Sequence, residues 1–387
     1  MRRPVSLTSG ACLTRRSLLI GASAAAATVA TTSLIPPRSA SANSRSTLSQ
    51  PTSLRALAEE KGLVLGAAFA EHELDEPYSA RYAQAYRDDV DAITSELSFK
   101  MSSLRPNAHT LDFAPADRLM KFASDNAFKV RAHTLIWNDD LPEWIHQLRS
   151  AEVEQLLDAH LLTIMERYRG QVWAWDVVNE PIAPWDKLPG NLRKGPYYSA
   201  MGEGYIARAF RAARRHDANA LLVLNEAQTE AVDRNGQVFR DSLLALLKRL
   251  KADDTPIDAI GLQSHLRSDL PYNMGRFVGF LDEIAALGYA IHITECDVND
   301  SAIQGTVTDR DLAVAQIYRN FLKPVLAHKA VKALTFWQLS DRTSWLYYAD
   351  QSKGGDRLPR PLLLDAEFRR KPAWHAVAEA LKEMPPR

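Results

Sequence analysis

Cysteine is scarce in this sequence: among 387 residues only Cys12 and Cys296 occur. Because Cys12 lies in a segment that we expect to be cleaved, the remaining chain cannot form an intramolecular disulfide. Metal sites built on cysteine are excluded for the same reason. Cys296 is interpreted as a small buried residue of a strand. The stability of the folded chain must therefore come from its core.

Acidic residues are absent from the first 42 positions. This segment carries five arginines, and Arg15 and Arg16 directly precede a weakly apolar, alanine-rich stretch. The pattern resembles a twin-arginine export signal, with small residues near Ala42 for a signal peptidase. A membrane anchor is the alternative, but the apolar run is short and diluted by Gly, Ser and Thr. We therefore expect residues 1–42 to be a signal peptide, and the mature protein to be periplasmic or secreted without stable membrane association.

A surplus of positive charge is also lacking. Without those five arginines, 42 basic residues stand against 47 acidic ones, which argues against a nucleic-acid partner. No GxGxxG or Walker sequence occurs, and no cofactor is indicated. After a polar, serine-rich linker at residues 43–52, no further linker or repeat appears. Residues 53–387 are therefore predicted to form one domain, and a monomer is expected.

Short apolar runs alternate with amphipathic segments along this domain. A helix is predicted over 152–168, where apolar residues follow helical spacing. Pro115 and Asp117 mark the first turn of another helix, and Thr308 with Asp311 resembles a capping box for the next-to-last helix. The eight apolar runs lie at residues 64–68, 92–96, 130–135, 172–178, 221–225, 259–263, 290–295 and 331–337. This alternation predicts an α/β fold, a (β/α)8 TIM barrel.

Polar residues follow several of these apolar runs, at the strand ends where a barrel places its chemistry. The fourth and seventh strands lie nearly opposite each other, and they end in Glu180 and Glu295. Two such carboxylates are the arrangement of glycoside hydrolysis, which needs no metal. Either glutamate alone could be a solvated or salt-bridged residue, but the polar neighbours Asn179, His265 and Asp297 favour a catalytic pair. Tryptophans at or beyond strand ends could stack on sugar rings or pack in the core.

Four motifs follow the predicted strands in order: HTLIWNDDLPEW at 133–144, WDVVNEP at 175–181, GLQSH at 261–265 and ITECDV at 293–298. In order and spacing these motifs resemble those of the family 10 glycoside hydrolases, which are mostly retaining endo-β-1,4-xylanases. The resemblance implies an endo-acting glycosidase that cleaves xylan-type polysaccharide through a covalent glycosyl-enzyme intermediate.

The resemblance also implies roles for individual residues. Glu180 would be the general acid/base and Glu295 the nucleophile. Asn179 would bind the sugar 2-hydroxyl, and His265, supported by Asp297, would orient and polarise the nucleophile. The other matched positions would bind sugars on the non-reducing side or form aromatic walls: Glu96, Lys100, His133, Trp137, Gln263, Trp337 and Trp345.

Some positions depart from that family's pattern. Residues 96–101 read Glu-Leu-Ser-Phe-Lys-Met in place of Glu-Asn-Glu-Met-Lys-Trp, so a sugar-binding amide is missing at Leu97. Residues 225–228 read Asn-Glu-Ala-Gln in place of Asn-Asp-Tyr-Asn. Asn138 stands where histidine is usual, Asp140 where glutamine is usual, and Gln338 where glycine is frequent. These changes bear on substrate range more than on mechanism.

Three alternatives stay open at the level of sequence. The same two carboxylates would serve a glycosidase acting on another β-glycan or on short xylo-oligosaccharides. An inactive carbohydrate-binding barrel would explain the altered second-strand motif. A metal-dependent hydrolase could use His133, His265, Glu295 and Asp297 as ligands, although the usual His-x-His pair near the first strand is absent.

Overall fold

The computed structural model describes residues 53–347, 349 and 357–387. All of them belong to one compact unit, Ser49–Arg387. The predicted signal peptide at 1–42 and the linker at 43–52 lie outside the described residues. No helix in the described part of the chain combines the length and the apolar character that crossing a membrane requires.

Eight parallel strands close into a barrel, as the sequence predicts. Each strand pairs with the next, and β10 pairs with both β9 and β1, which completes the circle. Two further short strands, β4 (Ile136–Trp137) and β8 (His265–Arg267), pair with the last residues of β5 and β9. The barrel strands are β1 (Val64–Phe69), β2 (Ala92–Ser95), β3 (Lys129–Ala132), β5 (Ala174–Asn179), β6 (Leu221–Glu226), β7 (Ala259–Leu262), β9 (Ala290–Asn299) and β10 (Val331–Phe336).

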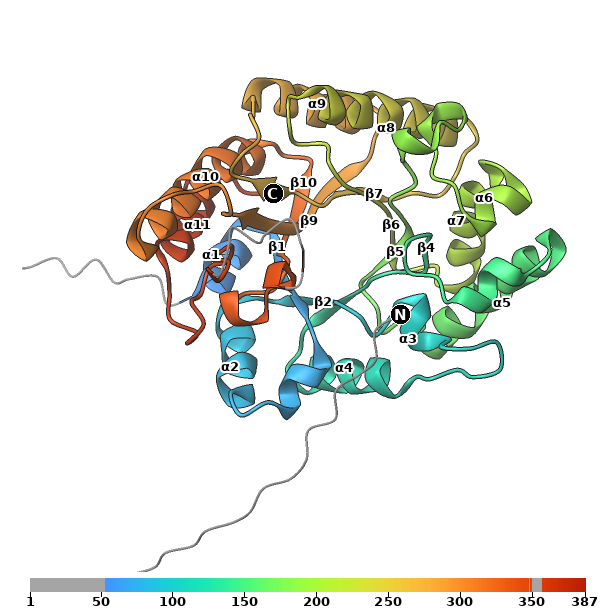
Figure 1. Cartoon of the computed structure of the whole chain (residues 1–387), viewed down its shortest axis with the longest axis horizontal. Helices are drawn as coiled ribbons and strands as arrows, with labels where there is room; N and C mark the ends of the chain where they lie inside the picture. The colour runs from blue at the N-terminus through green and yellow to red at the C-terminus, as the bar shows by residue number, and fades with distance from the viewer. Residues whose placement is uncertain (1–52, 348, 350–356) are drawn as a thin grey trace, which may run out of the picture. The chain divides into compact units, whose positions relative to one another are not determined.

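Helices surround these strands, which lie in the middle of the view in Figure 1. Short 3-10 turns occur in the loops, at Glu71–Asp75, Glu143–Gln147, Pro184–Asp186, Pro189–Asn191, Asp341–Thr343 and Trp345–Tyr347. The α-helices are α1 (Leu54–Lys61), α2 (Ser79–Asp89), α3 (Met101–Leu104), α4 (Ala114–Asp125), α5 (Ser150–Arg167), α6 (Pro196–Met201), α7 (Gly204–His216), α8 (Arg234–Ala252), α9 (Met274–Ala286), α10 (Val307–Ala327) and α11 (Pro372–Glu383). The predicted (β/α)8 barrel is confirmed.

The amphipathic pattern at 152–168 corresponds to α5, which begins two residues earlier and ends one residue earlier than predicted. Its apolar face is buried, as the spacing of Val153, Leu157 and Leu161 requires. Helix α4 has Pro115 and Asp117 in its first turn, as predicted. Local signals therefore place these two helices to within a few residues.

The predicted capping box of α10 is displaced by two residues. The side chain of Thr306 accepts the backbone N–H of Asp309, and the Asp309 carboxylate accepts the N–H of Thr306. Thr308 lies inside the first turn, so its backbone is already helical and it cannot be the cap. Asp311 is instead buried and forms an ion pair with Arg360 at 2.7 Å.

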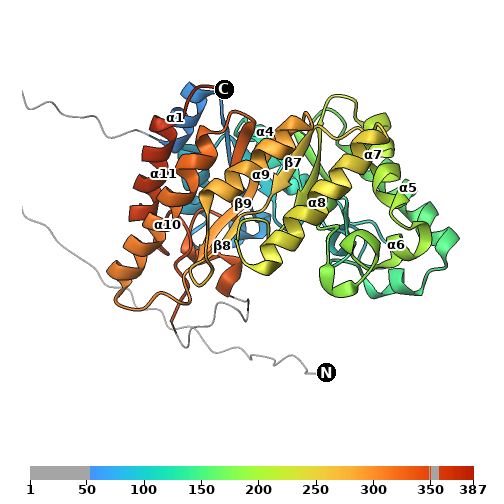
Figure 2. The ribbon, with the colours of Figure 1, turned by 90° about the horizontal axis from the view of Figure 1, so that it is seen from above.

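The last helix ties the two ends of the barrel together. Figure 2 shows α11 beside α10 and α1. Trp374 of α11 is fully buried, and its Nε1 donates to Asp89 of α2 at 2.8 Å. The other Asp89 oxygen accepts the N–H of Leu54 at the start of α1. Trp374 is therefore a core residue.

Candidate active site

Glu180 directly follows β5, and its backbone turns sharply there, with φ at 51°. Its N–H still donates to the carbonyl of Asn225 on β6, at 2.8 Å. The carboxylate is held on both sides: Gln263 Nε2 donates to Oε1 at 2.8 Å, and Arg193 donates to Oε2 at 3.0 Å. The side chain keeps 16% of its surface exposed, so it stays accessible to a ligand.

Glu295 lies within β9 and is more deeply buried, with 5% of its surface exposed. Asn225 Nδ2 donates to its Oε1 at 2.7 Å, and His265 Nε2 lies 3.1 Å from its Oε2. Asn225 also donates to Asn179 Oδ1 at 2.9 Å, and Gln263 Nε2 lies 3.5 Å from the same oxygen. Asn179 therefore joins the polar groups that hold the two glutamates.

His265 connects Glu295 to a second carboxylate. Its Nδ1 lies 2.9 Å from Oδ1 of Asp297, and Trp345 Nε1 donates to Oδ2 of Asp297 at 2.7 Å. Burial alone would lower the pKa of His265, but the charges and hydrogen bonds of Asp297 and Glu295 outweigh it and raise that pKa well above its usual value. These contacts favour the protonated form of the imidazole beside Glu295.

The electrostatic surroundings of Glu295 favour its ionised form. Burial raises the pKa of this carboxyl, but the hydrogen bond from His265, the charges of His133 and His265, and the donor from Asn225 together lower it below the usual range. An ionised carboxylate is the form that a nucleophile requires.

A row of rings continues from His265 across the barrel opening. The ring of Trp337 lies between those of His265 and His133, with centroids 6.2 and 5.4 Å away. Trp137 follows at 6.2 Å from His133, and Lys100 Nζ stands 4.9 Å above its ring. Glu96 joins this row through Gln338, the residue after Trp337, whose side chain contacts Glu96. All twelve residues that the sequence predicts for the site are thus connected.

Beneath this row, His133 is fixed by a buried ion pair. Its Nδ1 lies 3.0 Å from Oδ2 of Asp176, which is also paired with the guanidinium of Arg131. The His133–Thr134 peptide bond is cis. Neither Arg131 nor Asp176 is singled out by the sequence, because a charged residue within an apolar strand gives no sign of the partner that it meets.

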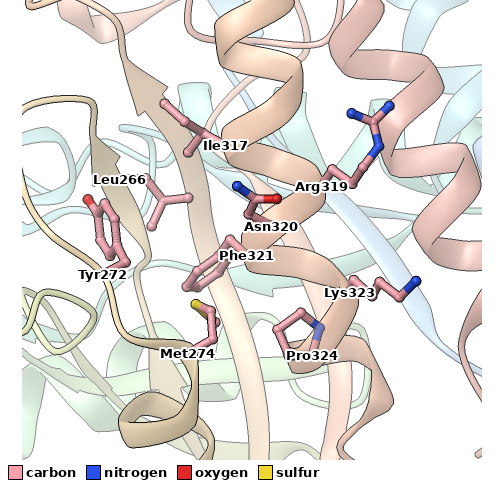
Figure 3. Close-up of a pocket in the computed structure, with 9 residues that line it drawn as sticks. All are labelled: Leu266, Tyr272, Met274, Ile317, Arg319, Asn320, Phe321, Lys323 and Pro324. Atoms are coloured by element: carbon pink, nitrogen blue, oxygen red, sulfur yellow. The ribbon is translucent and has the colours of Figure 1, made fainter.

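A cavity of about 420 Å³ opens beside Glu180 and is lined by Glu180, Gln263, His265, Asp297, Trp345 and the loop after β6. A larger hollow of about 610 Å³ lies elsewhere, where Leu266 and Met274 face Ile317 and Phe321 of α10 (Figure 3). Glu180 and His265, the partner of Glu295, line the smaller cavity, and neither of them lines the larger hollow. The smaller cavity is therefore the candidate active site.

Sequence reasoning missed two residues that hold the catalytic pair. Arg193 contacts both the carboxylate and the carbonyl of Glu180, and it pairs with Asp139. It lies in a loop, where no periodic pattern marks it. Asn225 was noted only as part of an altered motif, although its place at a polar strand end is the signal that could have identified it.

Two departures from the family pattern, Asp140 and Asn138, have structural explanations. Asp140 accepts the N–H and hydroxyl of Ser102 at the start of α3. Asn138 fills the space above Gly195, where an added Cβ would come within 2.0 Å of its side-chain oxygen. Leu97 is 41% exposed.

Cys296 is buried, as expected, and burial raises the pKa of its thiol well above its usual value.

In the described part of the chain, no group of three or more His, Cys, Asp and Glu residues is arranged to hold a metal ion. A parallel barrel whose strand ends bring together two glutamates, an imidazole and several indoles defines a glycosidase of the two-carboxylate class. Residues 53–380 match the model of glycosyl hydrolase family 10, and the chain belongs to that family, which is a retaining one.

Relatives of known activity agree with this assignment. The chain is 32% identical over 332 residues to endo-1,4-beta-xylanase 3 of Hypocrea jecorina, covering 85% of this chain and 86% of that protein. It is 28% identical over 337 residues to endo-1,4-beta-xylanase B of Thermotoga neapolitana, covering 87% and 93%. Among solved structures, xylanase 10B of Thermotoga petrophila in complex with xylobiose superposes with a TM-score of 0.77 at 29% identity, covering 86% of this chain and 98% of that one.

Proposed function

We propose that this chain is a retaining endo-β-1,4-xylanase, with Glu295 as the nucleophile and Glu180 as the acid/base. The observation that carries the proposal is the different treatment of the two glutamates. Glu295 is buried beside the N–H donor of Asn225 and the imidazole of His265, which lower the pKa of its carboxyl and favour the ionised form. Glu180 is more exposed and lines the cavity that a leaving group could occupy.

The reaction then has two steps. The Glu295 carboxylate attacks the anomeric carbon while Glu180 gives its proton to the departing glycosidic oxygen, which leaves a covalent glycosyl-enzyme. Glu180, now ionised, takes a proton from water, whose oxygen attacks the same carbon and releases Glu295. Asn179, held by Asn225, would bond the sugar 2-hydroxyl as positive charge develops on the ring.

Xylan-type polysaccharide is the proposed substrate because the named relatives are xylanases. The indoles of Trp137, Trp337 and Trp345 offer flat apolar faces for sugar rings. Glu96 and Lys100 add charged groups that can form hydrogen bonds with sugar hydroxyls on the non-reducing side of the cleavage point. Residues 96–101 differ from the family pattern at positions that bind sugars. Short xylo-oligosaccharides should therefore be compared with the polymer as substrates.

The test is release of reducing sugar from β-1,4-xylan, measured beside glucan and mannan with product lengths determined. Wild type is expected to act on xylan and to give oligosaccharides rather than single sugars. Glu295→Ala should abolish the activity, and Glu180→Ala should reduce it about 100- to 10,000-fold. Glu383→Ala, an exposed glutamate of α11, is the matched control and should act as wild type. Full activity of Glu295→Ala would refute the mechanism.

We also propose that the chain is exported by the twin-arginine route. The arginines and the absence of acidic residues in 1–42 support this. The test expresses the full chain in a bacterium with an intact twin-arginine system and measures xylanase activity in cell fractions. Replacing Arg15 and Arg16 by lysine should retain the protein in the cytoplasm, while the same change at Arg2 and Arg3 should not. Export of both variants alike would contradict the proposal.

A further inference from the structure

Gln338 is an unusual residue for its position. It follows Trp337 at the end of β10 with φ at 83°, in the left-handed region that favours glycine. The family resemblance places glycine here in many members. A side chain in this backbone conformation introduces strain, which persists only where the surroundings stabilise it.

The surroundings of Gln338 provide that stabilisation. Its side chain is fully buried. Oε1 accepts hydrogen bonds from the hydroxyls of Tyr86 at 2.7 Å and Thr343 at 3.1 Å, and the hydroxyl of Tyr82 lies 3.4 Å away. Nε2 donates to Oε2 of Glu96. Since an ionised carboxylate can only accept, this contact fixes which end of the amide faces Glu96.

Gln338 thereby holds Glu96 through only one of its two carboxylate oxygens, Oε2. Its other oxygen, Oε1, accepts no hydrogen bond from the described residues and remains available to a hydroxyl. Burial raises the pKa of Glu96, and the hydrogen bond from Gln338 together with the charge of Lys100 offsets part of that rise. Gln338 thus acts on both the orientation and the charge of this carboxylate.

The neighbouring position makes this contact more consequential. Leu97 stands where the family pattern has a sugar-binding amide, and it presents an exposed apolar side chain instead. An amide is present near Glu96 after all, but it comes from the end of β10. Because Gln338 is buried, it meets Glu96 from inside the protein rather than contacting a sugar.

We propose that Gln338 is a positioning residue for Glu96 and thereby determines how strongly the enzyme binds the second sugar on the non-reducing side of the cleavage point. The proposal rests on the proposed xylanase function. It predicts that loss of the Gln338 donor weakens binding of that second sugar without impairing bond cleavage at the first.

The test compares two substrates that differ by one sugar. Nitrophenyl β-xyloside places its only sugar at the reacting position, whereas nitrophenyl β-xylobioside adds the second sugar. Gln338→Met keeps the volume and removes the donor. It should lower the ratio of kcat/KM for the xylobioside to that for the xyloside about tenfold, the factor of a lost hydrogen bond to a charged group. The change should appear as a higher KM for the xylobioside, with kcat little changed. Gln84→Met, on the exposed face of α2, is the matched control.

Gln338→Glu provides a second signature and carries the test if Gln338→Met does not fold. Its carboxyl faces Glu96, so the two acids share one proton and the ratio should recover as the pH falls. The charged groups around Glu96 are Lys100 and His72, which favour its ionised form, and Glu73, which opposes it. A pH-independent ratio equal to that of wild type would overturn the proposal.

Equal losses on both substrates would also overturn it, since they would indicate a purely structural role. Wild-type enzyme that cleaves neither nitrophenyl glycoside nor xylan would refute the proposed function itself. Wild type that cleaves all three, with an unchanged ratio in a folded Gln338→Met variant, would refute only the role of Gln338.

Discussion

At the scale of single residues, the two glutamates differ through their partners rather than their own chemistry. Glu295 accepts from Asn225 and lies against His265, which in turn is paired with Asp297. Glu180 is held by Gln263 and Arg193 at the edge of the cavity. The charge state of Glu295 therefore depends on a carboxylate, Asp297, that it does not touch.

Asp297→Asn tests that dependence. Without the negative charge of Asp297, the pKa of His265 should fall, and the pKa of Glu295 should rise because it loses part of the positive charge that lowers it. Glu295 must be ionised to attack, so activity should be lost at a higher pH than in wild type as the solution is acidified. The measurement is the pH profile of kcat/KM on xylan oligosaccharides. Asp282→Asn, exposed on α9, should leave the acid limb in place.

At the scale of elements, α10 shows how one cap fixes a helix start. Thr306 and Asp309 satisfy each other's backbone N–H groups, which the first turn leaves without helical partners. The sequence offers a second Thr and Asp at the same spacing, Thr308 and Asp311, which made the start ambiguous. Only the extended backbone of Thr306 before the helix decides between them.

Replacing the two threonines separately distinguishes their roles. Thr306→Ala should lower the free energy of unfolding by about 1 kcal/mol, since it removes the cap. Thr308→Ala should change it by no more than about 0.5 kcal/mol, because Thr308 is exposed and caps nothing. Urea unfolding followed by circular dichroism measures both. A larger loss in Thr308→Ala than in Thr306→Ala would contradict the observed cap.

At the scale of the whole domain, stability depends on closing the barrel. Strand β10 completes the circle by pairing with β1, and α11 covers the join by packing on α10 and α1. Trp374 is central to this contact, since its indole is fully buried and bonds Asp89. In residues 53–387 the only cysteine is Cys296, so no disulfide within this range can replace such packing.

Trp374→Ala should therefore destabilise the protein by about 3 to 5 kcal/mol, through the cavity left by the indole and the loss of the donor to Asp89. Trp185→Ala is the matched control, because that indole is 53% exposed and its loss leaves no buried cavity. Thermal melts of the two variants beside wild type provide the comparison. Equal melting temperatures for both variants would show that the contact of α11 contributes little.

The sequence by itself determined the eight strands, the alternating helices and the two glutamates, although β9 continues four residues beyond Glu295, where the sequence predicts its end. These follow from periodicity and from polar residues after apolar runs, which are local properties. The tertiary structure alone decided which donor meets each carboxylate oxygen. Asn225 reaches Glu295 across 70 residues, and Gln338 reaches Glu96 across 242. Such contacts depend on barrel closure, and no local pattern encodes them.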